Sequence, residues 1–240
     1  MENTVYIALS QQTALRRQLQ VIANNLANMN TPAYKNESLV FERYLMPAGV
    51  GHTLSYVEDY GIVRKESEGP LQKTGNPLDV AIDGPGYLTV QTPNGVQYTR
   101  DGHLQLNDRG QLTTGAGYPV LDTAGQPITL DPRSGSPSIA SDGTISTPAG
   151  PLGRIGVVEF ANPQALREAE GGYYTAKAQA PLPAQNTQVM QGMIEQSNVN
   201  PMIEITRMMT LLRDYQSTQN VLKADNQRRM AAIQNLAKVP

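Results

Sequence analysis

The sequence predicts an α+β protein in which N- and C-terminal helices form a coiled-coil-like domain and the middle forms an antiparallel all-β domain, sandwich-like or barrel-like. Both ends of the 240-residue chain place apolar residues at alternating spacings of three and four, the pattern of a helix that packs along a seam. The middle is rich in Gly, Pro and Thr, and turn signals separate its short alternating segments. The two patterns occupy different parts of the chain, so we expect separate domains.

The first helix is expected over residues 1–30. Its apolar seam has a period of 3.5 residues, which predicts a partner helix and a left-handed supercoil. The helix should end before Pro32, because proline disfavours helical geometry in the residue that precedes it. The expected N-terminal assembly seam consists of Val5, Ala8, Gln12, Leu15, Leu19, Ile22, Leu26 and Met29, in which Gln12 is the polar position.

The second helical pattern lies within residues 188–238. Ser197 or Asn198 can cap the helix, and Pro201 is tolerated in a first turn. Polar positions in its seam weaken packing but help to fix register. The expected C-terminal assembly seam consists of Ile205, Met208, Leu212, Tyr215, Gln219, Leu222, Asn226, Ile233 and Leu236, with Arg229 in a further polar position.

Two arrangements of these helices are open from the sequence. They can pack on each other or on the central domain, or they can form a separate coiled-coil layer that also contacts other subunits. Their lengths, roughly 38 and 52 Å at 1.5 Å per residue, and their places at the chain ends favour the separate layer.

The central β domain is expected over residues 71–170. Alternating apolar residues place strands around Val80, Tyr98 and Leu104, and residues 154–160 have the pattern of a last core strand. Turn signals separate the strands at Pro93-Asn94-Gly95, Asp101-Gly102, Asp108-Arg109-Gly110, Ala124-Gly125 and Asp142-Gly143.

The remaining segments, residues 36–70 and 171–187, show no clear period. We expect them to be extended connectors between the two domains. The terminal-helix domain would then be discontinuous and comprise residues 1–35 and 188–240.

Composition excludes several classes of function. The absence of Cys removes disulfides, thiol nucleophiles, Cys-zinc sites and iron–sulfur clusters, and the two His lack helical metal partners. A net charge of −2 gives no basic field for nucleic acid. No run of about 18 apolar residues predicts membrane insertion, and the start does not resemble a cleaved signal peptide.

No residue pattern indicates catalysis. A nucleophile elbow, a dinucleotide loop and a phosphate-binding loop are all missing. The acid pairs Asp79/Asp83 and Asp101/Asp108 could be drawn as a glycosidase dyad, but Asp in a β-turn already has a structural role. We therefore expect no enzyme, no catalytic residue, no cofactor and no metal, with a peptidoglycan-acting enzyme as an alternative.

Three segments carry a resemblance to a known family. Residues 23–35 (ANNLANMNTPAYK), residues 75–112 and residues 195–200 (EQSNVN) occur in the family's order. Together they resemble the N-terminal, central and C-terminal signatures of bacterial flagellar rod, hook and hook-associated axial proteins. The signature residues in the first segment are Asn24, Asn25, Leu26, Asn28, Thr31, Tyr34 and Lys35.

The resemblance implies a structural subunit. Members of this family stack helically into a hollow shaft, with a coiled-coil layer of terminal helices inside and a β domain outside. The expected partners are copies of this chain, neighbouring proximal rod subunits, the distal rod protein and, in transit, the flagellar type III export apparatus. The expected location is the periplasmic rod of the basal body, reached without a cleaved signal peptide.

Within the family, residues 1–19 are most similar to proximal rod proteins. A distal rod protein of the same family is an alternative, and so is a monomeric binding module whose terminal helices form a closed pair. Ala33 stands where the family usually has Gly, from which we expect that this position needs no positive φ.

Overall fold

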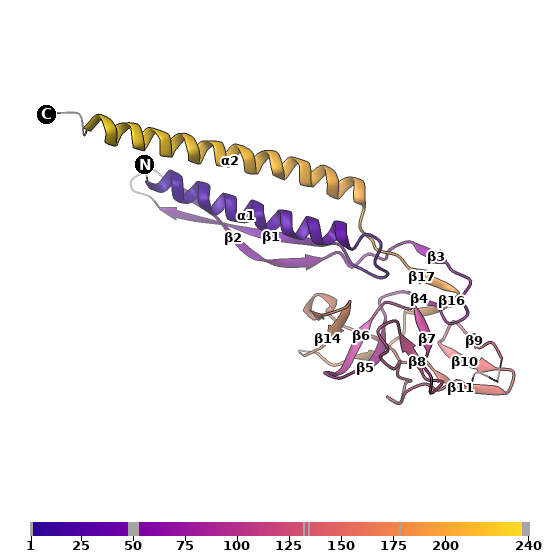
Figure 1. The fold of residues 1–240 in the computed structure, drawn as a ribbon. Coiled ribbons are helices and arrows are strands. Elements are labelled where there is room, and N and C mark those ends of the chain that lie inside the picture. Colours follow the sequence, from indigo (N-terminus) through magenta and orange to yellow (C-terminus); the bar gives the residue numbers. More distant parts are fainter. Residues whose placement is uncertain (1, 48–52, 132, 134, 178, 237–240) are drawn as a thin grey trace. The chain divides into compact units, whose positions relative to one another are not determined.

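The computed structural model describes residues 2–47, 53–131, 133, 135–177 and 179–236, and it confirms the α+β class (Figure 1). Two long helices, α1 (Glu2–Ala27) and α2 (Pro201–Leu236), accompany antiparallel strands. The chain divides into two compact units. The helical unit comprises residues 1–27, 36–65 and 200–240, and the β unit comprises residues 28–35 and 66–199.

The helical unit contains a long hairpin as well as the two helices. Strands β1 (Glu37–Pro47) and β2 (Thr53–Arg64) pair antiparallel, α1 contacts both strands, and α1 also contacts α2. The expectation of an extended connector at 36–70 is therefore corrected. A β-bulge shifts the register between Val40 and Phe41, and charged residues such as Arg43 and Glu58 interrupt the apolar pattern of the two strands in the sequence.

The β unit is built from antiparallel pairs throughout its described residues. One sheet has six strands in the order β13-β14-β6-β5-β12-β15, a second has the order β11-β10-β9, and three further pairs are β16–β4, β17–β3 and β7–β8. The strands are β3 (Leu71–Lys73), β4 (Val80–Asp83), β5 (Tyr87–Thr92), β6 (Gly95–Thr99), β7 (Leu104–Leu106), β8 (Leu112–Thr114), β9 (Ser138–Ile139), β10 (Thr144–Thr147), β11 (Gly150–Arg154), β12 (Val157–Glu159), β13 (Arg167–Ala169), β14 (Tyr173–Thr175), β15 (Leu182–Pro183), β16 (Gln188–Gln191) and β17 (Met193–Glu195).

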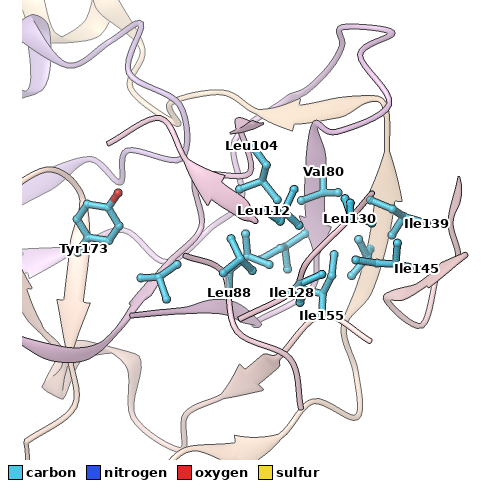
Figure 2. Packing of buried hydrophobic residues seen from close by; sticks show 14 residues of the cluster. Val80, Leu88, Leu104, Leu112, Ile128, Leu130, Ile139, Ile145, Ile155 and Tyr173 are labelled. Atoms are coloured by element: carbon cyan, nitrogen blue, oxygen red, sulfur yellow. The ribbon is translucent and has the colours of Figure 1, made fainter. Parts of the chain in front are cut away.

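Two apolar clusters form the core of the β unit. Figure 2 shows the larger one, in which Val80, Leu104 and Leu112 converge from three strands. The smaller cluster is aromatic: Tyr87 packs edge-on against Phe160 with ring centres 5.7 Å apart. Because these side chains come from distant parts of the chain, the core fixes the topology of the whole unit.

Two other boundaries differ from the sequence prediction. Residues 171–187 supply β14 and β15 to the six-stranded sheet, and residues 188–199 form β16 and β17 before the last helix begins. Asn200, not Ser197 or Asn198, caps α2, because its Oδ1 accepts a hydrogen bond from the Ile203 N–H at 3.3 Å.

Ala33 also corrects a sequence expectation. Its φ is 58°, the only positive φ of a non-glycine residue in the described part of the chain. The left-handed conformation aims the Ala33 N–H at the Glu195 carbonyl at 2.9 Å. This position therefore has a positive-φ requirement, which the chain meets with alanine.

Substitutions at Ala33 should reveal this strain. Ala33→Val places a β-branched residue at positive φ in a buried position, and we expect it to lower the free energy of unfolding by about 2 kcal/mol or more. Ala33→Gly relieves the same strain and should be at least as stable as the parent chain. Urea unfolding followed by near-ultraviolet circular dichroism of the tyrosines measures both, and equal stability of the valine variant would contradict the account.

Candidate functional site

The inner face of α1 carries most of the expected N-terminal seam. Ala8, Leu15 and Ile22 are buried, and the other seam residues of the helix with described side chains are half-buried. Half-buried are Gln12, Leu19 and Leu26. The Val5 side chain lies outside the described residues, and Met29 follows the end of α1, so the described part of the seam on the helix runs from Ala8 to Leu26.

The inner face of α2 differs from the expected seam. Every second residue of the expected seam is replaced on this face by the residue that precedes it in the sequence. Its buried and half-buried stripe consists of Glu204, Met208, Leu211, Tyr215, Thr218, Leu222 and Asp225, again at spacings of three and four. Two polar residues occupy buried positions because their groups are satisfied. Thr218, for example, donates its hydroxyl to the Asp214 carbonyl at 3.0 Å.

The expected C-terminal seam is therefore split between two faces of α2. Met208, Tyr215, Gln219 and Leu222 are half-buried, whereas Ile205, Leu212, Asn226, Arg229 and Ile233 are exposed, and the Leu236 side chain lies outside the described residues.

A second apolar stripe lies on the exposed side of α2. Met202, Ile205, Met209 and Leu212 recur at spacings of three, four and three, and between 38% and 73% of each residue is exposed to solvent. These spacings are those of a seam that packs along one partner helix. We call these four residues the outer stripe.

Asn25 is the most connected residue of the N-terminal signature in the helical unit. Its side-chain amide pairs in both directions with the backbone of Glu37, donating to the carbonyl at 2.8 Å and accepting from the N–H at 2.9 Å. This pairing attaches the last turn of α1 to the first residue of β1.

The buried carboxylate of Glu204 lies beside Asn25. It accepts hydrogen bonds from Asn36 at 3.3 Å and from Arg207 at 2.9 Å, and a weaker one from Asn25 at 3.5 Å. Glu204 is 2% exposed, so these donors replace the water that a buried charge would otherwise lose. A pocket of about 410 Å³ adjoins it, lined mainly by Val21, Ile22, Leu39 and Leu211.

A second and stronger polar centre lies in the β unit. The Glu195 carboxylate is fully buried and accepts hydrogen bonds from Lys35 Nζ at 2.7 Å, Arg100 Nε at 2.8 Å and the Gly69 N–H at 2.9 Å. Lys35 Nζ also donates to the Ser67 carbonyl at 3.1 Å. We call Glu195 with these three donors the Glu195 node.

Arg100 attaches the node to the core strands. Its guanidinium donates to the carbonyls of Gly84 and Gly86 at 2.8 Å each and of Ile82 at 3.1 Å, while its Nε faces Glu195. The Glu68 carboxylate lies 3.7 Å away and balances part of the remaining positive charge. The planar guanidinium of arginine can bind several carbonyls and a carboxylate at once, because it has five N–H donors in a fixed geometry.

Charge and burial oppose each other within the node. Burial raises the pKa of Glu195, but Arg100 and Lys35 outweigh it and hold that pKa below its ordinary value. Burial and the neighbouring Arg100 lower the pKa of Lys35, against the opposing pull of Glu195. The carboxylate is thus the element that makes two buried cations tolerable.

The remaining signature residues lie in the last turns of α1 and in the segment that follows it. Lys35 is buried in the Glu195 node, and Tyr34 is half-buried and accepts the Asn198 N–H through its carbonyl. Thr31 donates to the Asn28 side chain at 3.0 Å. Asn24 is exposed and Leu26 is half-buried.

Sequence reasoning assigned no role to Arg100, Glu195 or Glu204. The first two stand within signature segments, which was the only available signal. A charged residue in a loop or strand carries no periodic mark of burial, so its partner is known only once the fold brings distant segments together.

The acid pairs considered as a glycosidase dyad have structural partners instead. Asp79 accepts from Asn76 at 2.9 Å and lies 3.0 Å from the His103 ring, and Asp101 accepts the His103 N–H at 3.0 Å. Among the described residues, no group of three His, Cys, Asp or Glu could hold a metal. No helix in the described part of the chain is long and apolar enough to cross a membrane.

Comparison with known proteins places these centres in a family context. Three family models match: "Flagella basal body rod protein" over residues 5–35, "Flagellar hook protein FlgE/F/G D1 domain" over 81–147 and "Flagellar basal body rod FlgEFG protein C-terminal" over 190–235. Each matched segment contributes one charged residue of the Glu195 node, namely Lys35, Arg100 and Glu195.

Full-length relatives agree with these models. The chain is 38% identical to the flagellar basal-body rod protein FlgF of Caulobacter vibrioides, with all of both chains covered. It is 35% identical to FlgF of Mesorhizobium japonicum, covering 93% of each chain. It is 31% identical to the rod protein FlgG of Bacillus subtilis, covering 95% of this chain and 96% of the relative.

The Asn25 pairing should be measurable as stability of the helical unit. Asn25→Ala leaves the Glu37 backbone groups and part of Glu204 without their partners, so we expect the free energy of unfolding to fall by about 1–3 kcal/mol. Gln20→Ala, at an exposed position of the same helix, is the matched control and should stay within about 0.5 kcal/mol of the parent. Urea unfolding monitored by far-ultraviolet circular dichroism compares them, and indistinguishable variants would refute the role of Asn25.

The Glu195 node should make the β unit sensitive to acid. Since its folded pKa is lowered, Glu195 contributes stability above its ordinary pKa of 4.5 that is lost as the pH falls through the folded value. Glu195→Gln should therefore be less stable at neutral pH and lose less stability on acidification. Glu168→Gln, an exposed control on β13, should keep the parent's dependence. Identical pH profiles of urea unfolding for the parent and Glu195→Gln would show that the carboxylate is not held ionised in this way.

Proposed function

We infer that this chain, which belongs to the flagellar basal-body rod protein family and is a structural subunit of the basal-body rod, joins its neighbours through its terminal helices. Those neighbours would be copies of itself and other rod subunits. The single observation that carries the proposal is the outer stripe of α2, because an apolar stripe at helical spacing is costly to leave in water.

The packing within the helical unit supports the same proposal. In one chain, α1 and α2 already cover their inner faces, and the outer stripe remains available as the interface of a larger coiled-coil layer. The pocket of about 410 Å³ beside Val21 and Leu211 is open to solvent and offers a further contact surface on the helical unit. A side chain from a neighbouring subunit would fill it.

A helical shaft follows from contacts of this type. In this proposal the outer stripe of one subunit meets a different surface of its neighbour, so the contact is heterologous, and heterologous contacts that do not close generate a filament. We propose a hollow shaft that transmits motor torque, with the terminal helices inside and the β unit, as a sandwich-like or barrel-like domain, supplying outer contacts.

The position in the rod is proposed to be proximal. Identities of 38% and 35% to FlgF proteins, compared with 31% to a FlgG protein, support the proximal subunit over the distal one. In this proposal the chain reaches the periplasm through the flagellar type III export apparatus without a cleaved signal peptide. It inserts into no membrane, binds no nucleic acid and has no enzymatic activity.

A closed monomeric binding module is the competing arrangement, since α1 and α2 also contact each other in one chain. The two proposals differ in the outer stripe. A closed module has no use for four exposed apolar residues in helical register, whereas a rod subunit needs them to meet another helix.

Charge on the outer stripe should prevent assembly without unfolding the subunit. The double variant Met209→Glu/Leu212→Glu places two carboxylates in the proposed interface, and we expect at least about a tenfold loss of co-assembly with other rod proteins. Ser217→Glu/Ala224→Glu adds the same charge at exposed positions on another face of α2 and should assemble normally. Motility of cells that produce each variant, with rod content in isolated basal bodies, reports the outcome. Normal rods with the first variant would overturn the proposal.

A further inference from the structure

The chain passes between its two units four times. The transitions follow residues 27, 35, 65 and 199, and on the side of the β unit they adjoin only three segments. These segments are residues 28–35, 66–71 and 195–199. Any force that passes along the chain from the β unit to the helices has to go through them.

Backbone hydrogen bonds connect the three segments to one another. The Ala33 N–H donates to the Glu195 carbonyl at 2.9 Å, and the Asn198 N–H donates to the Tyr34 carbonyl at 3.2 Å. The Gln196 N–H donates to the Pro70 carbonyl at 2.9 Å. The segment 195–199 therefore lies between the other two and is bonded to both.

The side chains of the Glu195 node repeat this connection. One oxygen of the Glu195 carboxylate binds Lys35 of the first segment and the Gly69 N–H of the second. The Ser67 carbonyl connects all three segments, because it accepts hydrogen bonds from Lys35 Nζ at 3.1 Å and from the Asn198 side-chain amide at 2.7 Å. The other carboxylate oxygen binds Arg100, which in turn holds three carbonyls of residues 82–86.

We propose that Glu195 is a positioning residue whose buried carboxylate fastens all three segments into a single joint anchored on the β core. In the folded chain the joint gives both terminal helices one common origin, whether or not the helices themselves are paired. In an assembled rod it would deliver force from the β unit to all four transitions at once, and this mechanical part rests on the proposed function.

The chemistry of the node fits a joint better than a simple core contact. An apolar contact is non-directional and would permit the segments to slide, whereas charge-assisted hydrogen bonds fix both distance and angle. Removing one partner of a buried ion pair is also far more disruptive than losing a surface pair, so the three segments should loosen together.

Hydrogen–deuterium exchange of the full chain tests the joint independently of rod assembly. In Glu195→Gln, we expect amides in residues 28–35, 66–71 and 195–199 to exchange about tenfold faster or more, as a group. Amides of β5 and β6 should remain within about twofold of the parent, and Glu168→Gln should change neither set. Faster exchange confined to residues 195–199, or spread equally to β5 and β6, would overturn the proposal.

A second variant keeps the test decisive if Glu195→Gln does not fold. Lys35→Met retains the Glu195–Arg100 pair but removes the ammonium that binds both Glu195 and Ser67. We expect faster exchange in residues 28–35 and also in 66–71. A change limited to residues 28–35 would show that the segments are not fastened together.

Swimming under load tests the mechanical part. Cells that produce whichever of these two variants folds should assemble rods but lose speed more steeply than the parent as the viscosity of the medium rises. Unchanged dependence on viscosity, or failure to assemble rods at all, would overturn the mechanical role. The outcome for the outer-stripe variants is independent of this result, so failure of the joint and failure of the proposed function can be told apart.

Discussion

The rest of the structure depends on one buried carboxylate held between two buried cations. Glu195 offsets much of the cost of burying Lys35 and Arg100 inside the β unit, and these two cations offset the cost of burying Glu195. Each of the three charges stands in a different matched segment of the chain. The node therefore forms only when the N-terminal, central and C-terminal segments come together as the chain folds.

A division of labour between the two units follows from this constraint. In the β unit, the Glu195 node holds the three connecting segments, residues 28–35, 66–71 and 195–199, against the apolar core. In the helical unit, Asn25 and Glu204 provide a smaller polar centre, which fixes how α1, β1 and α2 meet. With the C-terminal end of α1 and the N-terminal end of α2 specified by polar contacts, the apolar outer stripe of α2 is left for other subunits.

Features that depend on the local spacing of residues could be predicted from the sequence. Features that depend on contacts between distant segments could not. Alternating spacings predicted both long helices, and turn residues predicted the hairpin at Asp142-Gly143. The face of α2 that turns inward was not predictable from apolar residues alone, because Glu204 and Thr218 are buried by virtue of partners elsewhere. Charged residues within β1 and β2 obscured the pattern of the hairpin, and the positive φ of Ala33 accompanies a hydrogen bond to a residue 162 positions away.

The most direct test of the central claim is a double-mutant cycle between Lys35 and Glu195. The free energy of unfolding of the β unit would be measured by urea titration for the parent, Lys35→Met, Glu195→Gln and the double variant. If the node is one cooperative element, the two substitutions are strongly non-additive, with a coupling energy of about 1–3 kcal/mol. Additivity within about 0.3 kcal/mol would contradict the claim that these buried charges act as a unit.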